Sequence, residues 1–95
     1  MRELTPTQLD TLTRVFYGEF YIVKICLHAR NGAPNMEVWE FRDQFTAQVL
    51  TGRMASLFRR RLIQNSWSAN ELRAVYVTPK GIEELAKHLE CTVDG

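Results

Sequence analysis

Apolar residues recur at helical spacing through the first third of the chain. Residues 5–8 (Thr-Pro-Thr-Gln) can form an N-terminal capping box with proline at the first helical position. Leu9 and Leu27 lie 18 positions apart and are connected by five apolar steps, so the mean step is about 3.6, the period of an α-helix. The spacing continues through Gly18, so it predicts either one helix over residues 5–29 or two helices bent at that glycine. The apolar stripe consists of Leu9, Leu12, Phe16, Phe20, Val23 and Leu27.

Two shorter helices are predicted after a turn. Residues 31–35 (Asn-Gly-Ala-Pro-Asn) combine residue types that break helices and form turns. Apolar positions then return at helical spacing over residues 37–45 and again over residues 46–62, where Thr46 can cap the second helix. Two helices joined by a short turn form a helix-turn-helix. Their predicted buried residues are Val38, Phe41, Phe45, Leu50, Met54, Leu57 and Phe58.

The last third of the chain predicts a β-hairpin followed by a helix. Polar, turn-forming residues and then a β-branched and aromatic run indicate a two-stranded hairpin over residues 63–78, with its tip near residues 68–70. A Thr-Pro pair then starts a helix over residues 79–90. The element order predicts one mostly α domain over residues 1–95 with a small β-hairpin, a winged helix-turn-helix with an additional or extended N-terminal helix.

The positive charge is concentrated in one segment. The chain carries 12 Lys and Arg and 11 Asp and Glu, a formal net charge of +1. Residues 44–80 contain six bases and one acid (6 − 1 = +5), and the other residues contain six bases and ten acids (6 − 10 = −4). A one-sided positive field suits a phosphate-binding surface, although a solvated helix face gives the same count. The six bases are Arg53, Arg59, Arg60, Arg61, Arg73 and Lys80.

This basic part of the chain resembles a known family of transcription regulators. Residues 59–63 (Arg-Arg-Arg-Leu-Ile) and residues 73–81 (Arg-Ala-Val-Tyr-Val-Thr-Pro-Lys-Gly) resemble the recognition-helix end, the wing and the next helix start of MarR-type winged-helix regulators. Glu71 and Arg73 match the acid-x-arginine motif of that family's wing. The resemblance covers residues 37–85, and it implies binding of double-stranded DNA with Arg73 in the minor groove.

These patterns predict sequence-specific binding of double-stranded DNA by a small transcription regulator. The helix over residues 46–62 would enter the major groove, which is wide enough for one helix. We expect a homodimer formed through the N-terminal helix, with Leu9, Leu12, Phe16 and Phe20 at the interface. The alternative is a winged-helix module that binds a protein partner, of the kind found among phage and mobile-element accessory factors. The predicted DNA-binding residues are Gln48, Thr51, Arg53, Ser56, Arg59, Arg60 and Arg73.

Other function classes have little support in the sequence. His28 and His88 have no metal-ligating neighbour at helical spacing, and the chain has no glycine-rich phosphate loop and no nucleophile motif. We therefore expect no enzymatic activity, no cofactor and no metal ion. The first residues carry no signal-peptide pattern, and the apolar run from Phe20 to Leu27 is too short to span a bilayer. We expect a cytoplasmic protein that does not enter a membrane.

Overall fold

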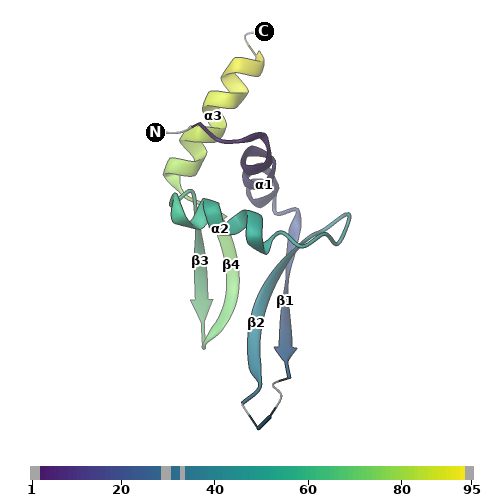
Figure 1. The fold of residues 1–95 in the computed structure, drawn as a ribbon. Helices are drawn as coiled ribbons and strands as arrows, with labels where there is room; N and C mark the ends of the chain where they lie inside the picture. The colour runs from purple at the N-terminus through teal and green to yellow at the C-terminus, as the bar shows by residue number, and fades with distance from the viewer. Residues whose placement is uncertain (1–2, 29–30, 33, 94–95) are drawn as a thin grey trace.

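The computed structural model describes residues 3–28, 31–32 and 34–93, with side chains described as far as His88. Within these residues the chain forms three helices and two antiparallel β-hairpins (Figure 1). In chain order the elements are α1 (Pro6–Tyr17), β1 (Phe20–Leu27), β2 (Met36–Asp43), α2 (Thr51–Arg59), β3 (Ile63–Ser68), β4 (Glu71–Val77) and α3 (Pro79–Val93).

The first helix begins where the sequence predicts but ends earlier than predicted. The Gln8 amide donates to Thr5 Oγ1 at 3.1 Å, and the Thr5 amide donates to Gln8 Oε1 at 3.0 Å, so the predicted capping box is confirmed. α1 ends at Tyr17 because Gly18 has a φ of +69°, the left-handed conformation that glycine adopts without steric cost. The Gly18 amide donates back to the Val15 carbonyl at 3.1 Å, which closes the last turn.

The predicted mostly α fold is wrong, because the residues after Gly18 form a strand. Phe20–Leu27 is β1, which pairs antiparallel with β2, and it is not the second half of a helix over residues 5–29. Apolar residues occupy nearly every position of β1, so a subset of them fits a helical period by coincidence. Aromatic and β-branched residues favour extended backbone, and pairing with β2 stabilises this conformation through cross-strand contacts.

A second strand replaces the first helix of the predicted helix-turn-helix. The spacing of apolar residues predicts a helix over residues 37–45, but these residues lie largely in β2. Trp39, Phe41 and Asp43 alternate along the strand, and the last two are buried. A period of two on this face therefore replaces the period of 3.6, and the predicted helix-turn-helix is absent from the described part of the chain.

The helix predicted over residues 46–62 is also shorter than expected. α2 comprises Thr51–Arg59 and follows a loop. Thr46 does not cap the helix, because Leu50 occupies the N-cap position and Thr46 Oγ1 accepts the Gln48 amide at 3.3 Å within the loop. At the other end Arg61 has a φ of +60°, and this left-handed residue stops the helix.

The second hairpin and the last helix agree with the sequence patterns. β3 pairs antiparallel with β4, and the two strands meet at the predicted tip near residues 68–70. α3 begins at Pro79, and Thr78 Oγ1 accepts the Gly81 amide at 3.1 Å, as an N-terminal cap does. Caps and tight turns depend on residues only a few positions apart, so the local sequence is sufficient to predict them.

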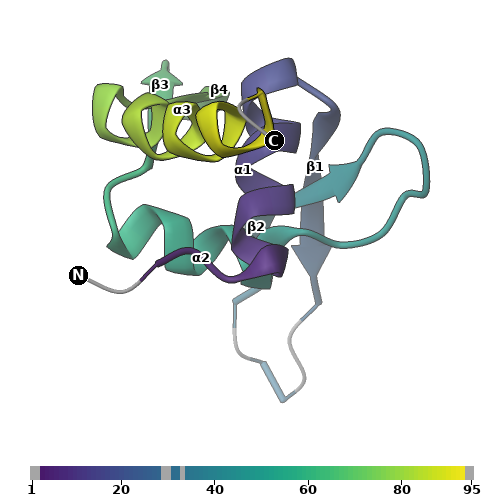
Figure 2. The same cartoon turned by 90° about the horizontal axis from the view of Figure 1, so that it is seen from above.

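Both hairpins extend to the same side of the molecule, away from the helices (Figure 1). α1 contacts both α2 and α3, which lie on opposite sides of the view from above (Figure 2). The core lies where these helices meet the bases of the hairpins. Its fully buried apolar side chains are Leu12, Leu50, Met54, Leu57 and Leu62.

The homodimer interface predicted on the first helix needs correction. Leu12 is fully buried, and Leu9 and Phe20 pack against the same core. Three of the four predicted interface residues are therefore used inside one copy of the chain. Phe16 is the member of that set with a largely exposed side chain.

The turn between β3 and β4 offers a stabilising substitution. Ala69 and Asn70 have φ values of +52° and +63°, as a two-residue type I′ turn requires. Asparagine tolerates this conformation, whereas the Cβ of alanine opposes it. Ala69→Gly is expected to raise the free energy of unfolding by about 1 kcal/mol in chemical denaturation. Ser68→Gly, one residue earlier in β3, is expected to lower it, and a loss of stability in both variants would contradict this account.

Candidate nucleic-acid interface

The exposed side of α2 is narrow and carries small side chains. Gly52, Ala55 and Arg59 are exposed at helical spacing, and Gln48 is exposed in the loop before the helix. The 9 residues of α2 span about 13 Å, comparable with the ~12 Å width of the major groove of B-DNA. Because Gly52 and Ala55 are short, the helix backbone can approach a partner surface closely.

Three of the predicted DNA-binding residues use their polar groups to hold α2 in place. Thr51 Oγ1 accepts the Phe41 amide at 2.9 Å, which fastens the start of α2 to β2. Gln8 Nε2 donates to Ser56 Oγ at 3.2 Å, and Arg60 Nη1 donates to Gln8 Oε1 at 3.2 Å. The Gln8 side chain thus ties the start of α1 to the middle and the end of α2.

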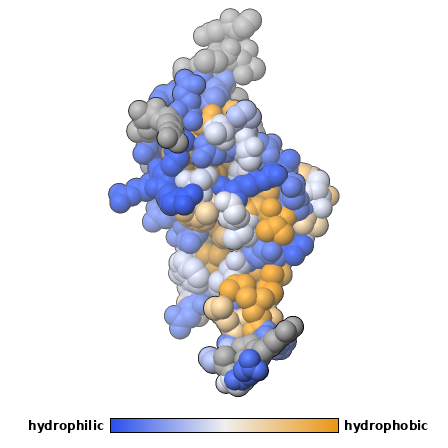
Figure 3. Space-filling view, in the orientation of Figure 1, coloured by the Kyte–Doolittle hydropathy of each residue, from blue (hydrophilic) through white to orange (hydrophobic). Residues whose placement is uncertain are grey.

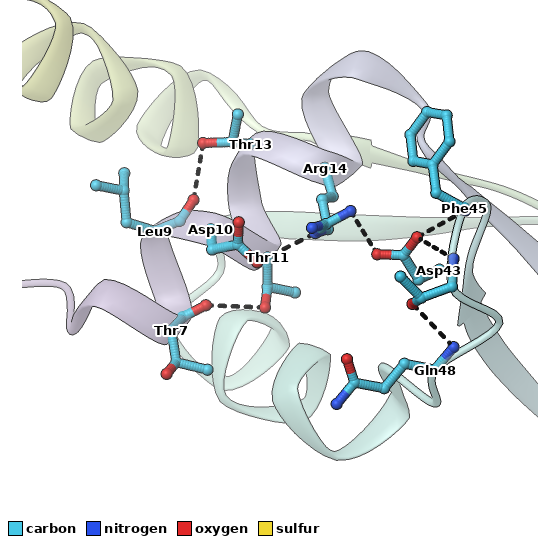
Figure 4. Close-up of polar contacts among 10 residues, drawn as sticks. Thr7, Leu9, Asp10, Thr11, Thr13, Arg14, Asp43, Phe45 and Gln48 are labelled. Carbon is cyan, nitrogen blue, oxygen red and sulfur yellow. Dashed lines mark hydrogen bonds and ion pairs between the residues drawn. The ribbon is translucent and has the colours of Figure 1, made fainter.

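A buried carboxylate organises the loop before α2 (Figure 4). Asp43 is 2% exposed, and its Oδ1 accepts the amides of Phe45 at 2.7 Å and Thr46 at 3.1 Å. Its Oδ2 forms an ion pair with Arg14 of α1. The hydrogen bond from Phe45, then that from Thr46 and the charge of Arg14, lower the pKa of Asp43 below its ordinary value, while burial acts in the opposite direction. The Asp43 amide also donates to the Gln48 carbonyl at 2.8 Å, so both ends of the loop are fastened.

Most cations between Arg53 and Lys80 lack the acidic partners that the described cations outside residues 44–80 have. Among the described side chains, no carboxylate forms an ion pair with Arg53, Arg59, Arg61 or Lys80. Arg53 is half-buried and contributes to the lowered pKa of Asp43 through its charge, so it acts partly within the fold. By contrast, every described Lys and Arg outside residues 44–80 forms an ion pair. These paired residues are Arg14, Lys24, Arg42 and Lys87.

The fold brings two exposed cations together that the sequence analysis left out of the site. Thr78 Oγ1 donates to the Arg61 carbonyl at 2.7 Å, which places the start of α3, with Lys80, beside the end of α2. Figure 3 shows a hydrophilic surface on the side of the molecule where α2 ends and α3 begins in Figure 1. We call Arg59, Arg61 and Lys80 the basic cluster. Its signals in the sequence were the arginine run and the lysine after the Thr-Pro pair.

Arg73, the predicted wing arginine, lies apart from the basic cluster. Its Nη2 forms an ion pair with Glu71 at 3.1 Å, and both side chains are about half exposed. Arg73 lines a groove between β4 and β1 to which no residue of α2 contributes. The predicted site therefore divides into exposed residues on α2, residues that brace α2, and Arg73 on a different surface.

The described residues contain neither a membrane-spanning helix nor a metal-binding group. No helix among them has the length and apolar character needed to cross a membrane. No three of their His, Cys, Asp and Glu side chains come together in a way that could hold a metal ion. Comparison of the chain with protein-family models, with curated proteins and with solved structures finds no match.

Proposed function

We propose that the protein binds double-stranded DNA through the exposed side of α2 and the basic cluster, as a small sequence-specific transcription regulator of the cytoplasm. The proposal rests on which cations form ion pairs with acidic side chains. The described cations outside residues 44–80 are neutralised by neighbouring acids, whereas the basic cluster has no acidic partner among the described side chains. An unpaired cation binds phosphate without first breaking an internal ion pair, and a group of them attracts a polyanion.

The two parts of this surface would perform different tasks. Gly52 and Ala55 would let the backbone of α2 approach the base edges of the major groove, and the exposed amide of Gln48 suits pairing with adenine. The basic cluster at the C-terminal end of α2 would neutralise phosphates, and such contacts fix the register of a protein on the duplex without reading its sequence. Sequence preference would then come from α2 and overall affinity from the basic cluster.

The backbone at Arg61 supports a role for its charge. Arg61 has a φ of +60°, where a residue with a Cβ costs about 1 kcal/mol more than glycine. Residues held in such conformations often serve a function that offsets their cost. A phosphate contact made by the Arg61 guanidinium is such a function, because glycine at the same position would end α2 equally well.

The affinity for random duplex DNA is expected to fall steeply with salt. Neutralising about three phosphates per protomer gives a log–log slope of about −3 per protomer, which fluorescence anisotropy can measure. The Arg59→Ala/Arg61→Gly variant removes two of the cations and should reduce the slope by about two. The glycine suits the left-handed backbone, so the variant is not expected to unfold.

A matched control removes the same amount of charge elsewhere. Lys24→Ala/Lys87→Ala deletes two exposed lysines that are paired with Glu37 and Glu84. Its salt slope is expected to equal that of the unmodified chain. A slope near zero for the unmodified chain, or the same loss of slope in both double variants, would exclude the basic cluster as a DNA-binding surface.

A further inference from the structure

Large apolar side chains gather around a groove on the side of the molecule away from α2. The groove has a volume of about 810 Å³ and lies between the end of α1, the start of β1 and the length of β4. A smaller apolar hollow of about 120 Å³ adjoins it between α1 and α3. Five large side chains that line the two hollows are between 40% and 64% exposed. They are Phe16, Tyr17, Tyr21, Tyr76 and Ile82.

The area of this surface is that of a functional apolar patch. Aromatic side chains bury about 150–250 Å² each when fully enclosed, so the four aromatic members at about half exposure leave roughly 400 Å² of surface, to which Ile82 adds. The largest apolar patch on a monomeric protein is about 300–600 Å² and often has a function. A standard protein interface buries about 800 Å² per partner, of which the centre is apolar and the rim polar. The patch has the size of such a centre.

The charges beside the groove limit what can occupy it. The charged side chains of its lining are Glu71 and Arg73, which pair with each other at 3.1 Å, so the lining has no net charge. A nucleic acid or an anionic membrane would be attracted by unpaired cations, and this lining offers none. Two copies of a neutral apolar surface do not repel each other.

The shape of the surface also fits a second copy of the chain. Tyr17, the most exposed member of the patch, stands between the large groove and the smaller hollow. In a two-fold interface each copy presents the same patch, so every protrusion needs a hollow within that patch. Trp39 and Trp67 make an edge-to-face contact with ring centroids 6.4 Å apart, which links β2 to β3 and supports the walls of the groove.

We infer that a second copy of this chain docks on the groove and forms a two-fold dimer centred on Phe16, Tyr17 and Ile82. The inference rests on the proposed function in one respect, because it explains how two α2 helices reach one duplex. No residue of α2 lines the groove. Dimerisation through the groove leaves both copies of α2 exposed, since α2 contributes nothing to its lining.

The test is the solution mass of the full chain without DNA. Sedimentation equilibrium is expected to show a monomer of 11.0 kDa at low concentration and a twofold larger mass at high micromolar concentration. Tyr17→Lys and Ile82→Glu place charges in the patch at helix ends where the helix dipole favours them, so both variants should fold. Each is expected to weaken dimerisation by about tenfold or more.

A matched control and a DNA measurement separate this inference from the proposed function. Phe45→Lys adds a charge at a side chain that is 69% exposed but lies outside the groove, and it should leave the dimer intact. A monomer at all concentrations, or equal weakening by Phe45→Lys and Tyr17→Lys, would overturn the inference. Ile82→Glu should still bind random DNA as a monomer with the slope expected per protomer. If the unmodified chain is a monomer that binds DNA with the expected salt slope, only the dimer is contradicted. If it is a dimer whose salt slope is near zero, only DNA binding is contradicted.

Discussion

Gly81→Ala is expected to destabilise the fold by about 1–3 kcal/mol and to lower the Tm by on the order of 10 °C, because the added methyl group has no space. A Cβ at this position would lie 2.6 Å from Val77 Cγ1 and would also collide with the Leu62 carbonyl oxygen. That carbonyl cannot move aside easily, since it accepts the Thr78 amide at 2.9 Å. The close packing of α3 on the end of α2 therefore requires glycine, and thermal unfolding followed by circular dichroism measures the effect.

Gly52 provides the matched control for this substitution. A Cβ on Gly52 would meet no atom within 4 Å, and the residue lies inside α2 with ordinary helical backbone. Gly52→Ala is expected to stabilise the protein by up to about 1 kcal/mol, because alanine has the higher helix propensity. The two substitutions are chemically identical and should have opposite signs. A stabilising Gly81→Ala would show that α3 does not pack on Leu62 as described.

Asp43→Asn is expected to lower the Tm at neutral pH by on the order of 10 °C, because it removes the charge from a buried ion pair. The introduced side-chain amide could still accept hydrogen bonds through its one carbonyl oxygen, but the guanidinium of Arg14 would lose its buried anionic partner. Asp10→Asn is the control, since Asp10 also pairs with Arg14, at 3.1 Å, but is half exposed. Surface ion pairs contribute little, so the control should change the Tm only slightly.

The effect of Asp43→Asn should depend on pH in a defined direction. The pKa of Asp43 in the folded protein lies below its ordinary value of 3.8, and the pKa of Arg14 is raised, so Arg14 stays charged throughout. The stabilisation from the Asp43 carboxylate is complete above the unfolded-state pKa and is lost as the pH falls through the folded-state pKa. The Tm difference between the unmodified chain and Asp43→Asn should therefore be constant near neutrality and shrink below about pH 4. A difference that grows on acidification would contradict the ion pair with Arg14.

The candidate site could be predicted from the sequence only in part. The arginine run located the end of α2, and the exposure of Gln48 and Arg59 agrees with a surface role. Lys80 could not be predicted as a site residue, because its place beside Arg61 depends on the packing of α3 against the end of α2. Ser56 was predicted to contact DNA, but its hydroxyl donates to the Arg53 carbonyl and accepts from Gln8, which is far away in the chain.

The sequence by itself determined the features that depend on near neighbours. The capping box at Thr5 and the hairpin tip near residues 68–70 each involve residues only a few positions apart, so the local sequence is sufficient to predict them. The concentration of charge in residues 44–80 is likewise a property of the sequence.

Only the tertiary structure decided that β1 and β2 are strands and which side chains are buried or exposed. The apolar residues of Phe20–Leu27 fit a helix and a strand almost equally well, and the pairing with Met36–Asp43 selects the strand, because backbone groups of one strand need those of another. The same long-range packing buries Leu12, which the sequence placed at a dimer interface, and leaves Tyr17 exposed beside a groove. A side chain's neighbours across the fold decide whether it stabilises the core or binds a partner, and its own periodicity does not contain that information.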